Sequence, residues 1–251
     1  MSEIPVFVIN LPRDKERRFF VETQLKKLNI LYEIVNGISG SDERVVQSYD
    51  EELAKKEQGK PLTNGEKGCA FSHRLLYERI IREEISCVLI LEDDVILPPY
   101  FKTIIETEGS KKYKSWDWLA LDYQPVGLIF IKNWMKVAYG MLKKRQITFF
   151  FMLLKFPYIV TLQMYEGLRE GIAVKTGYLS GPRLFLRPMY RTGAYMITLE
   201  GAKKMFHSTH PLRLSADRAP NQARIKNGLV YRGYVPVPVD QEQTFTSNTQ
   251  I

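Results

Sequence analysis

The sequence of 251 residues can form one large α/β domain or two small ones. Hydrophobic residues make up 45% and charged residues 25%, which is ordinary for a soluble globular protein with a substantial core. The two cysteines, Cys69 and Cys87, are too few for a disulfide framework and suit a reducing compartment. We find neither a secretory signal nor a window of roughly 18 apolar residues that would predict a membrane-spanning helix.

The basic charge of the chain is concentrated in one segment. A formal net charge of +8 and a pI near 9.3 favour polyanionic partners such as nucleic acid, acidic lipid or phosphorylated ligands. No Asp or Glu lies between Tyr123 and Tyr165. Six basic residues fall within that segment: Lys132, Lys136, Lys143, Lys144, Arg145 and Lys155.

The predicted elements alternate between strands and helices. We expect a strand over 4–9, a helix over 15–28, a strand over 31–35, a surface helix and loop over 40–60, a helix opened by Thr63 and running to about Glu84, and strands over 87–91 and 116–121. After residue 190 we expect a strand ending at 198, a helix over 199–206, a less defined stretch over 211–228 and an extended run over 231–239. This order predicts an α/β fold with a mixed, mostly parallel sheet flanked by helices.

Polar residues follow three of the predicted strands. Asn10 and Leu11 come after the first strand, Asn36 and Gly37 after the second, and the acidic residues 92–94 after the third. Ligands of such sheets bind beyond the carboxyl ends of the strands. We therefore expect these residues to meet in one crevice.

Three adjacent carboxylates, Glu92, Asp93 and Asp94, stand inside the apolar stretch LILEDDVIL. Carboxylates buried without partners are costly, and the hard cations Mn²⁺ and Mg²⁺ prefer oxygen ligands. Neighbouring residues of an extended chain point to opposite sides, so only one or two of the three can face a cation. The alternative is a solvated acidic turn. A phosphotransferase of the haloacid type is disfavoured because Glu92 replaces its first Asp and Val95 its Thr.

The segment 126–160 is apolar, aromatic and basic. On a helical wheel its lysines occupy about a third of the circumference and its large apolar residues the opposite side, which is typical of a helix lying in a membrane interface. The alternative is an ordinary helical insertion with its lysines in solvent. The missing acids favour the membrane interpretation. Because aromatic residues and lysines lie on opposite faces, a groove that stacks nucleic-acid bases is disfavoured.

Five segments, taken in order, resemble glycosyltransferase family 25, the bacterial lipooligosaccharide galactosyltransferases and their collagen-modifying relatives. They are LPRDKERR (11–18), EKGCAFSHRLLYERI (66–80), VLILEDDVIL (88–97), RTGAYMITLEGAKKMF (191–206) and VPVPVDQEQTFTSNTQI (235–251). The resemblance is thinnest over 123–180 and 207–230. It implies a GT-A fold, a UDP-sugar donor (most often UDP-galactose), Mn²⁺ (or Mg²⁺) and inversion at the anomeric carbon.

The resemblance also implies an organisation and a function. We expect a single GT-A-like domain over 1–251, with a nucleotide-sugar half (1–122), a basic amphipathic helical insertion (123–180) and an acceptor half (181–251). The expected reaction moves galactose from UDP-galactose to a lipid-linked lipooligosaccharide or lipopolysaccharide core saccharide. It would take place in the cytoplasm, at the inner-membrane surface, without nucleic acid. UDP-glucose or a UDP-N-acetylhexosamine as donor, or a basic nucleic-acid-binding module, are the alternatives.

The strand ends and the matched motifs together give a set of donor-binding candidates. They are Asn10, Leu11, Arg13, Arg17, Asn36, Gly37, Lys67, Gly68, His73, Glu92, Asp93, Gly193, Tyr195 and Gln241. Lys67 and Gly68 lie at a helix start, which favours anions, although tight packing would also explain Gly68. His73 lies on the stripe facing the sheet, where a histidine more often supports a pocket than catalyses.

The remaining predicted roles are those of metal ligand and general base. We assign the metal to Asp94, Glu92 and Asp240, and we expect Asp240 to close over the diphosphate together with Gln241. An inverting transferase needs a carboxylate that takes the proton of the acceptor hydroxyl. Asp217 is the candidate, with an N-cap as its alternative role, and Asp122 is the rival. His207 and His210 either complete a metal shell or lie on the surface.

Overall fold

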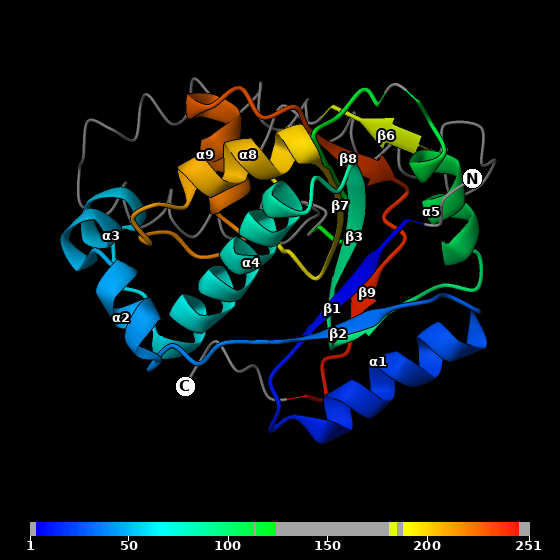
Figure 1. Ribbon diagram of the computed structural model, residues 1–251, viewed down its shortest axis with the longest axis horizontal. Helices are drawn as coiled ribbons and strands as arrows, with labels where there is room; N and C mark the ends of the chain where they lie inside the picture. The colour runs from blue at the N-terminus through cyan, green and yellow to red at the C-terminus, as the bar shows by residue number, and fades with distance from the viewer. Residues whose placement is uncertain (1–3, 113, 124–180, 185–187, 246–251) are drawn as a thin grey trace, which may run out of the picture. The chain divides into compact units, whose positions relative to one another are not determined.

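The computed structural model describes residues 4–112, 114–123, 181–184 and 188–245 (Figure 1). The chain divides into two compact units, Met1–Tyr123 with Pro182–Ile251, and Gln124–Gly181. All described residues except Gly181 belong to the first unit. The predicted insertion and its basic residues lie outside the described residues, and the single-domain organisation stays a prediction.

A seven-stranded sheet organises the first unit. Its order is β2-β1-β3-β7-β5-β8-β6, and its strands are β1 (Val6–Asn10), β2 (Glu33–Asn36), β3 (Cys87–Glu92), β5 (Trp118–Ala120), β6 (Gly181–Arg183), β7 (Ala194–Thr198) and β8 (Tyr231–Val235). β1 runs parallel to β2 and β3, and β5 runs parallel to β8. β7 is antiparallel to both of its neighbours, β3 and β5. The predicted α/β class with a mixed sheet is confirmed.

The helices follow the predicted order with three additions, namely a second helix within 40–60, the helix over 101–109 and the helix over 219–226. They are α1 (Lys15–Lys27), α2 (Glu43–Ser48), α3 (Glu51–Gln58), α4 (Asn64–Arg82), α5 (Phe101–Gly109), α8 (Leu199–Ser208) and α9 (Ala219–Lys226). The stretch 40–60 forms two helices because Asp42 and Asp50 each cap a helix start with their side chains. The stretch 211–228, expected to be less defined, contains α9. None of the described helices is long and apolar enough to cross a bilayer.

Both faces of the central strand β3 are covered. Leu89 and Leu91 join the core with residues of α1 and α5, while α4 and α8 lie on the other side of the sheet (Figure 1). There Trp118 stacks on Tyr195 with ring centroids 3.7 Å apart. A parallel strand buried on both faces needs a continuous apolar run, which is why the stretch before Glu92 has one.

Helix α4 begins where the sequence predicts, because its first turn carries a capping box. The Glu66 amide donates to Thr63 Oγ1 (3.1 Å), and the Thr63 amide donates to Glu66 Oε2 (2.8 Å). The loop after β2 packs directly on this first turn. A Cβ on Gly68 would lie 2.4 Å from the carbonyl oxygen of Ile38, so only glycine permits the approach.

A short pairing at the end of the chain lies next to the acidic residues. β4 (Val95–Ile96) follows Asp94 and pairs antiparallel with β9 (Asp240–Gln241). The Glu242 amide donates to the carbonyl oxygen of Asp94 (2.8 Å). The closing motif of the sequence therefore lies beside the acidic triplet, although the two are far apart along the chain.

Candidate functional site

A pocket of about 310 Å³ lies beyond the carboxyl ends of β1, β2 and β3. Its lining confirms that the three strand ends converge. The predicted site residues in that lining are Leu11, Arg13, Arg17, Gly37, Gly68, His73, Glu92, Asp93 and Asp94. The pocket is lined by the triplet on one side and by Asn64 and Gly65 of the first turn of α4 on another.

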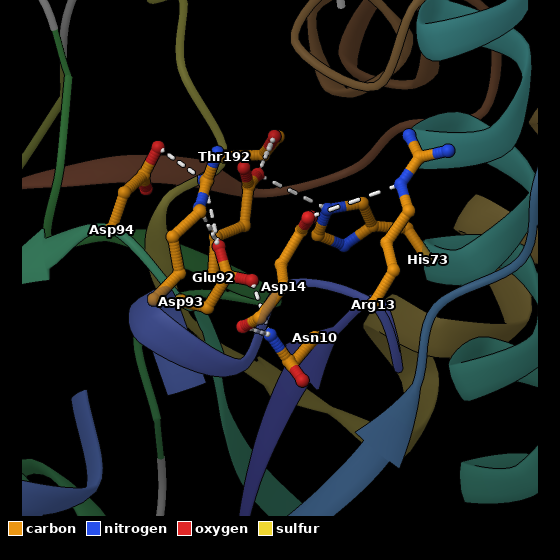
Figure 2. Close-up of polar contacts among 9 residues, drawn as sticks. Asn10, Arg13, Asp14, His73, Glu92, Asp93, Asp94 and Thr192 are labelled. Carbon is orange, nitrogen blue, oxygen red and sulfur yellow. Dashed lines mark hydrogen bonds and ion pairs between the residues drawn. The ribbon is translucent and has the colours of Figure 1, made fainter. Parts of the chain in front are cut away.

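Asp93 is held from the end of β1 and from α1. Asn10 Nδ2 donates to Asp93 Oδ2 (2.7 Å), and Arg17 Nε donates to Asp93 Oδ1 (2.7 Å), as Figure 2 illustrates for Asn10. Asp93 is 5% exposed. Asn10 is therefore placed to orient a carboxylate rather than to line the pocket.

Arg17 is the main counter-charge of the triplet. Its Nη2 lies 2.6 Å from Asp93 Oδ1 and 2.8 Å from Asp94 Oδ2, and its side chain is 12% exposed. Arg17 is therefore a partly buried partner of the triplet and not a solvated surface residue. A guanidinium between two carboxylates lowers the cost of burying them, since paired charges keep part of the stabilisation that water supplied.

Only one of the two carboxylate oxygens of Asp94 has a hydrogen-bonding partner among the described residues. Its Oδ2 pairs with Arg17, whereas its Oδ1 is buried and has no hydrogen-bond partner among the described residues. Burial, followed by the charge of Glu92, raises the pKa of Asp94 to about 7. A buried carboxylate oxygen without a partner fits a hard cation, which would supply the missing positive charge.

Glu92 is fixed by two side chains. Thr192 Oγ1 donates to Glu92 Oε1 (2.8 Å), and His73 Nε2 lies 3.3 Å from the same oxygen (Figure 2). Burial alone would raise the pKa of Glu92, but the hydrogen bond and charge of His73, with the Thr192 hydroxyl, hold it below its ordinary value. Glu92 is therefore an anion in a fixed orientation. Thr192 is a site residue that the sequence reasoning missed, although it stands in the matched RTGAYMIT motif.

His73 supports Glu92 from the predicted face of α4. Its Nδ1 lies 2.8 Å from Tyr195 Oη on β7, and its side chain is 1% exposed. Tyr195 is fully buried and lies behind His73. The prediction that Tyr195 lines the donor cleft is corrected: it contacts His73, because the β7 register directs its ring into the core opposite Ile90.

Asp122 forms a second buried carboxylate site at the end of β5. It is fully buried, and Arg191 Nη1 lies 3.2 Å from its Oδ1. Its Oδ2 has no hydrogen-bond partner among the described residues. Burial raises the pKa of Asp122 to about 7, although the charge of Arg191 opposes the shift. The same Arg191 atom lies 3.5 Å from Asp240 Oδ1.

Gly193 allows the segments around Asp122 to approach closely. A Cβ at this position would lie 2.5 Å from Asp122 Oδ2 and 2.7 Å from Gln241 Nε2. The predicted candidates Asp122, Gly193, Asp240 and Gln241 thus gather in one place, beside the strand that follows Asp94.

The other candidates lie outside the pocket lining. Asn36 ends β2, and the Lys67 ammonium stands 4.4 Å from the centroid of the Tyr49 ring instead of facing the pocket. Asp217 accepts a hydrogen bond from Ser215 Oγ (2.6 Å) in the turn before α9, whose N-cap is Arg218. The N-cap alternative for Asp217 is therefore wrong, and the structure does not bring Asp217 into the pocket. His207 and His210 lie in and after the last turn of α8 and are likewise not in its lining.

The loop after β2 is the part of the lining that the sequence reasoning missed. Ile38, Ser39, Gly40 and Ser41 all line the pocket. Small residues directly after a predicted strand were the available signal, because they leave room for a ligand near the backbone. The pocket thus has a small-residue wall facing an acidic one.

Comparisons with known proteins decide the family. The model of glycosyltransferase family 25, described as an LPS biosynthesis protein family, matches residues 3–219. The chain belongs to glycosyltransferase family 25. The resemblance seen in the five motifs of the sequence is thereby confirmed.

Relatives of the chain include animal members of the same family. It is 32% identical over 115 residues to procollagen galactosyltransferase 1-A of Xenopus laevis, a match covering 43% of this chain and 18% of the frog protein. It is 34% identical over 103 residues to a glycosyltransferase 25 family member of Drosophila melanogaster, covering 39% and 17% of the two chains. These matches span less than a fifth of the relatives' own length.

Among solved structures, a glycosyltransferase involved in the glycosylation of the major capsid of PBCV-1 superposes with a TM-score of 0.46. The sequence identity is 8%, over 99% of this chain and 98% of that one. A likeness at this level carries no inference about fold or function.

We expect the free energy of unfolding of Asp122→Asn, relative to that of wild type, to increase as the pH rises from about 4 to about 7. The ordinary pKa of 3.8 applies to the unfolded chain and about 7 to the folded one, so the folded state binds more protons in this window. Wild-type stability therefore falls with rising pH, whereas asparagine does not titrate. Urea unfolding of both proteins across this pH range measures the difference.

The matched control is Asp42→Asn on α2. Arg44 lowers the pKa of Asp42, so Asp42 titrates at the acid end of this window or below it, and the stability difference should stay flat over the rest of the window. Parallel stability curves for wild type and Asp122→Asn would contradict the buried, protonated state of Asp122.

Proposed function

We propose that this chain is a metal-dependent, inverting galactosyltransferase that uses UDP-galactose and extends a lipooligosaccharide or lipopolysaccharide core saccharide. The proposal rests on the convergence of three strand ends on one pocket in a member of family 25. Asp94 lines this pocket, and one of its carboxylate oxygens has no hydrogen-bond partner among the described residues. Such a pocket suits a ligand that brings a cation and a diphosphate together.

In this proposal Asp94 and Glu92 hold Mn²⁺ or Mg²⁺, with Asp240 near them on β9. The free Oδ1 of Asp94 and the fixed anion of Glu92 are hard oxygen donors that fit such an ion. When bound, the ion acts as a Lewis acid on the negative charge that develops on the departing nucleoside diphosphate.

Other groups of the pocket bind the nucleotide. Arg17 stays within reach of phosphate oxygens because it lines the pocket while neutralising Asp93 and Asp94. Gly68 lies near the start of α4, and Asn64 and Gly65 of its first turn also line the pocket, where the positive end of the helix dipole favours an anion. The small residues after β2 leave a wall against which the uridine can lie.

Of the two candidate bases, Asp122 is better supported than Asp217. A pKa near 7 suits a group that accepts the proton of an acceptor hydroxyl as that hydroxyl attacks the anomeric carbon. One Asp122 oxygen is free of hydrogen bonds among the described residues. Because Asp122 is fully buried, an acceptor reaches it only when Arg191 or Gln241 moves.

The acceptor is proposed from the charge pattern of the sequence. The acid-free segment between Tyr123 and Tyr165 would attract anionic headgroups and hold the enzyme at the cytoplasmic face of the inner membrane, where a lipid-linked saccharide is available. UDP-glucose and UDP-N-acetylhexosamines are the competing donors within the same reaction class.

We expect the protein to turn over UDP-galactose only with Mn²⁺ or Mg²⁺ present. Asp94→Asn should lower the rate by about 100-fold or more, since loss of the ion removes several kcal/mol of charge stabilisation in the transition state. A screen that detects UDP release from each UDP-sugar, with and without chelator, measures this without knowledge of the acceptor. Asp42→Asn, outside the pocket, serves as the control. Metal-independent turnover, or full activity in Asp94→Asn, would refute the assignment.

We expect the basic segment to bind anionic vesicles. Changing Lys132, Lys136, Lys143 and Lys144 to Gln should weaken sedimentation with vesicles containing phosphatidylglycerol, at ~1 kcal/mol per lysine. Phosphatidylcholine vesicles should bind wild type weakly.

A matched control removes the same charge elsewhere. Lys15, Lys26, Lys27 and Lys56 are exposed and lie outside the segment, so their change to Gln should leave most vesicle binding intact. Equal losses in the two variants would mean that net charge alone, and not this segment, drives binding.

A further inference from the structure

Three different kinds of metal-binding side chain meet at the wall of the pocket. Cys69 and His73 stand four residues apart on α4 and so lie on one face of the helix, and Glu92 ends β3 opposite them. A ligand atom of each, sulfur, ring nitrogen and carboxylate oxygen, lies within 4.8 Å of the other two. A mixed sulfur, nitrogen and oxygen set selects Zn²⁺ and similar borderline ions over Mn²⁺ or Mg²⁺.

His73 Nε2 is the ring nitrogen that faces this cluster. The Tyr195 hydroxyl donates to the Tyr77 hydroxyl (3.3 Å), so it is free to accept from His73 Nδ1–H (2.8 Å). Nε2 lies 3.3 Å from Glu92 Oε1, to which it donates when no ion is bound. A cation between the two groups would take the place of that proton. A histidine ligand whose second nitrogen donates to an outer partner is the common arrangement at metal centres.

Glu92 and Cys69 can both serve as anionic ligands. Thr192 fixes the Glu92 carboxylate through a 2.8 Å hydrogen bond. Cys69 lines the pocket as a free thiol, with its sulfur close to the ligand atoms of His73 and Glu92. A thiol that coordinates zinc releases its proton and binds as the thiolate.

We propose that Cys69, His73 and Glu92 form a site for Zn²⁺ or a similar borderline divalent ion, with its fourth position open to the pocket. All three residues line that pocket, so water or a ligand can complete the coordination. This site does not rest on the proposed glycosyl transfer. Because Glu92 belongs to both sets of ligands, Zn²⁺ bound here would compete with Mn²⁺ bound through Asp94.

Cobalt spectroscopy tests the site directly. Co²⁺ titrated into the metal-free full chain should produce a near-ultraviolet thiolate-to-cobalt charge-transfer band that saturates at one ion per chain and disappears when Zn²⁺ is added. The band should weaken as the pH falls, because a thiol must lose its proton to bind the ion. The chain has two cysteines, so the band can arise only from Cys69 or Cys87.

Matched variants identify the ligands. Cys69→Ser should abolish the band, whereas Cys87→Ser, in the buried strand β3, should retain it. Tyr195→Phe removes the partner of His73 Nδ1, together with the hydrogen bond to Tyr77, and should weaken Zn²⁺ affinity by about tenfold or more. Circular dichroism confirms that each variant is folded.

Three results would overturn the proposal: no band in wild type, a band that survives in Cys69→Ser, or unchanged Zn²⁺ affinity in Tyr195→Phe. Asp94→Asn separates this site from the proposed function, because it should lose sugar turnover and keep the cobalt band. A wild-type protein that shows the band but hydrolyses no UDP-sugar would refute the transferase proposal alone.

Discussion

The constraint on which the site depends is the burial of three adjacent carboxylates at the end of a strand that is covered on both faces. Each carboxylate receives a different compensation. Asp93 is held by Asn10 and Arg17, Glu92 by His73 and Thr192, and Asp94 by one bond to Arg17. The partners come from β1, α1, α4 and the segment before β7. The order of the strands in the sheet brings these four elements to the end of β3. It therefore also lowers the free-energy cost of burying the three carboxylates.

Two buried carboxylates of the site lack a full set of hydrogen bonds, and these two are the groups that can bind a proton or a cation. Asp94 and Asp122 each keep one buried oxygen without a hydrogen bond among the described residues, and burial raises the pKa of both to about 7. Such oxygens accept either a proton or a cation at neutral pH. We infer that Glu92 and Asp93 serve as the rigid part of the site, and that Asp94 and Asp122 are the groups whose state changes when ligands bind.

The strands, helices and site residues that were predicted correctly each have a local pattern in the sequence. The apolar run before Glu92 predicts a buried parallel strand, and Thr63 predicts the start of α4. From the resulting order of strands, the meeting of Leu11 and Gly37 with the triplet follows by the geometry of parallel sheets. The family motifs pointed to the same residues and to the same edge of the sheet.

The side-chain positions that could not be predicted from the sequence are set by contacts between residues far apart in the chain. Tyr195 lies opposite Ile90 because β7 inserts antiparallel beside β3, and no local pattern sets that register. Thr192 reaches Glu92 for the same reason. Lys67 was expected in the pocket, but the ring of Tyr49 on another segment attracts its ammonium. In each case the deciding partner is distant in sequence, so spacing alone gives no signal.

The most direct test of the central claim is the unfolding free energy of Arg17→Met, measured in urea with chelator and again with Mn²⁺. Removing the guanidinium leaves Asp93 and Asp94 buried without their counter-charge, so the variant should lose about 3 kcal/mol in chelator. Mn²⁺ should restore part of that loss, because an ion that binds only the folded state stabilises it. A variant as stable as wild type in chelator, or one whose stability does not respond to Mn²⁺, would contradict the account.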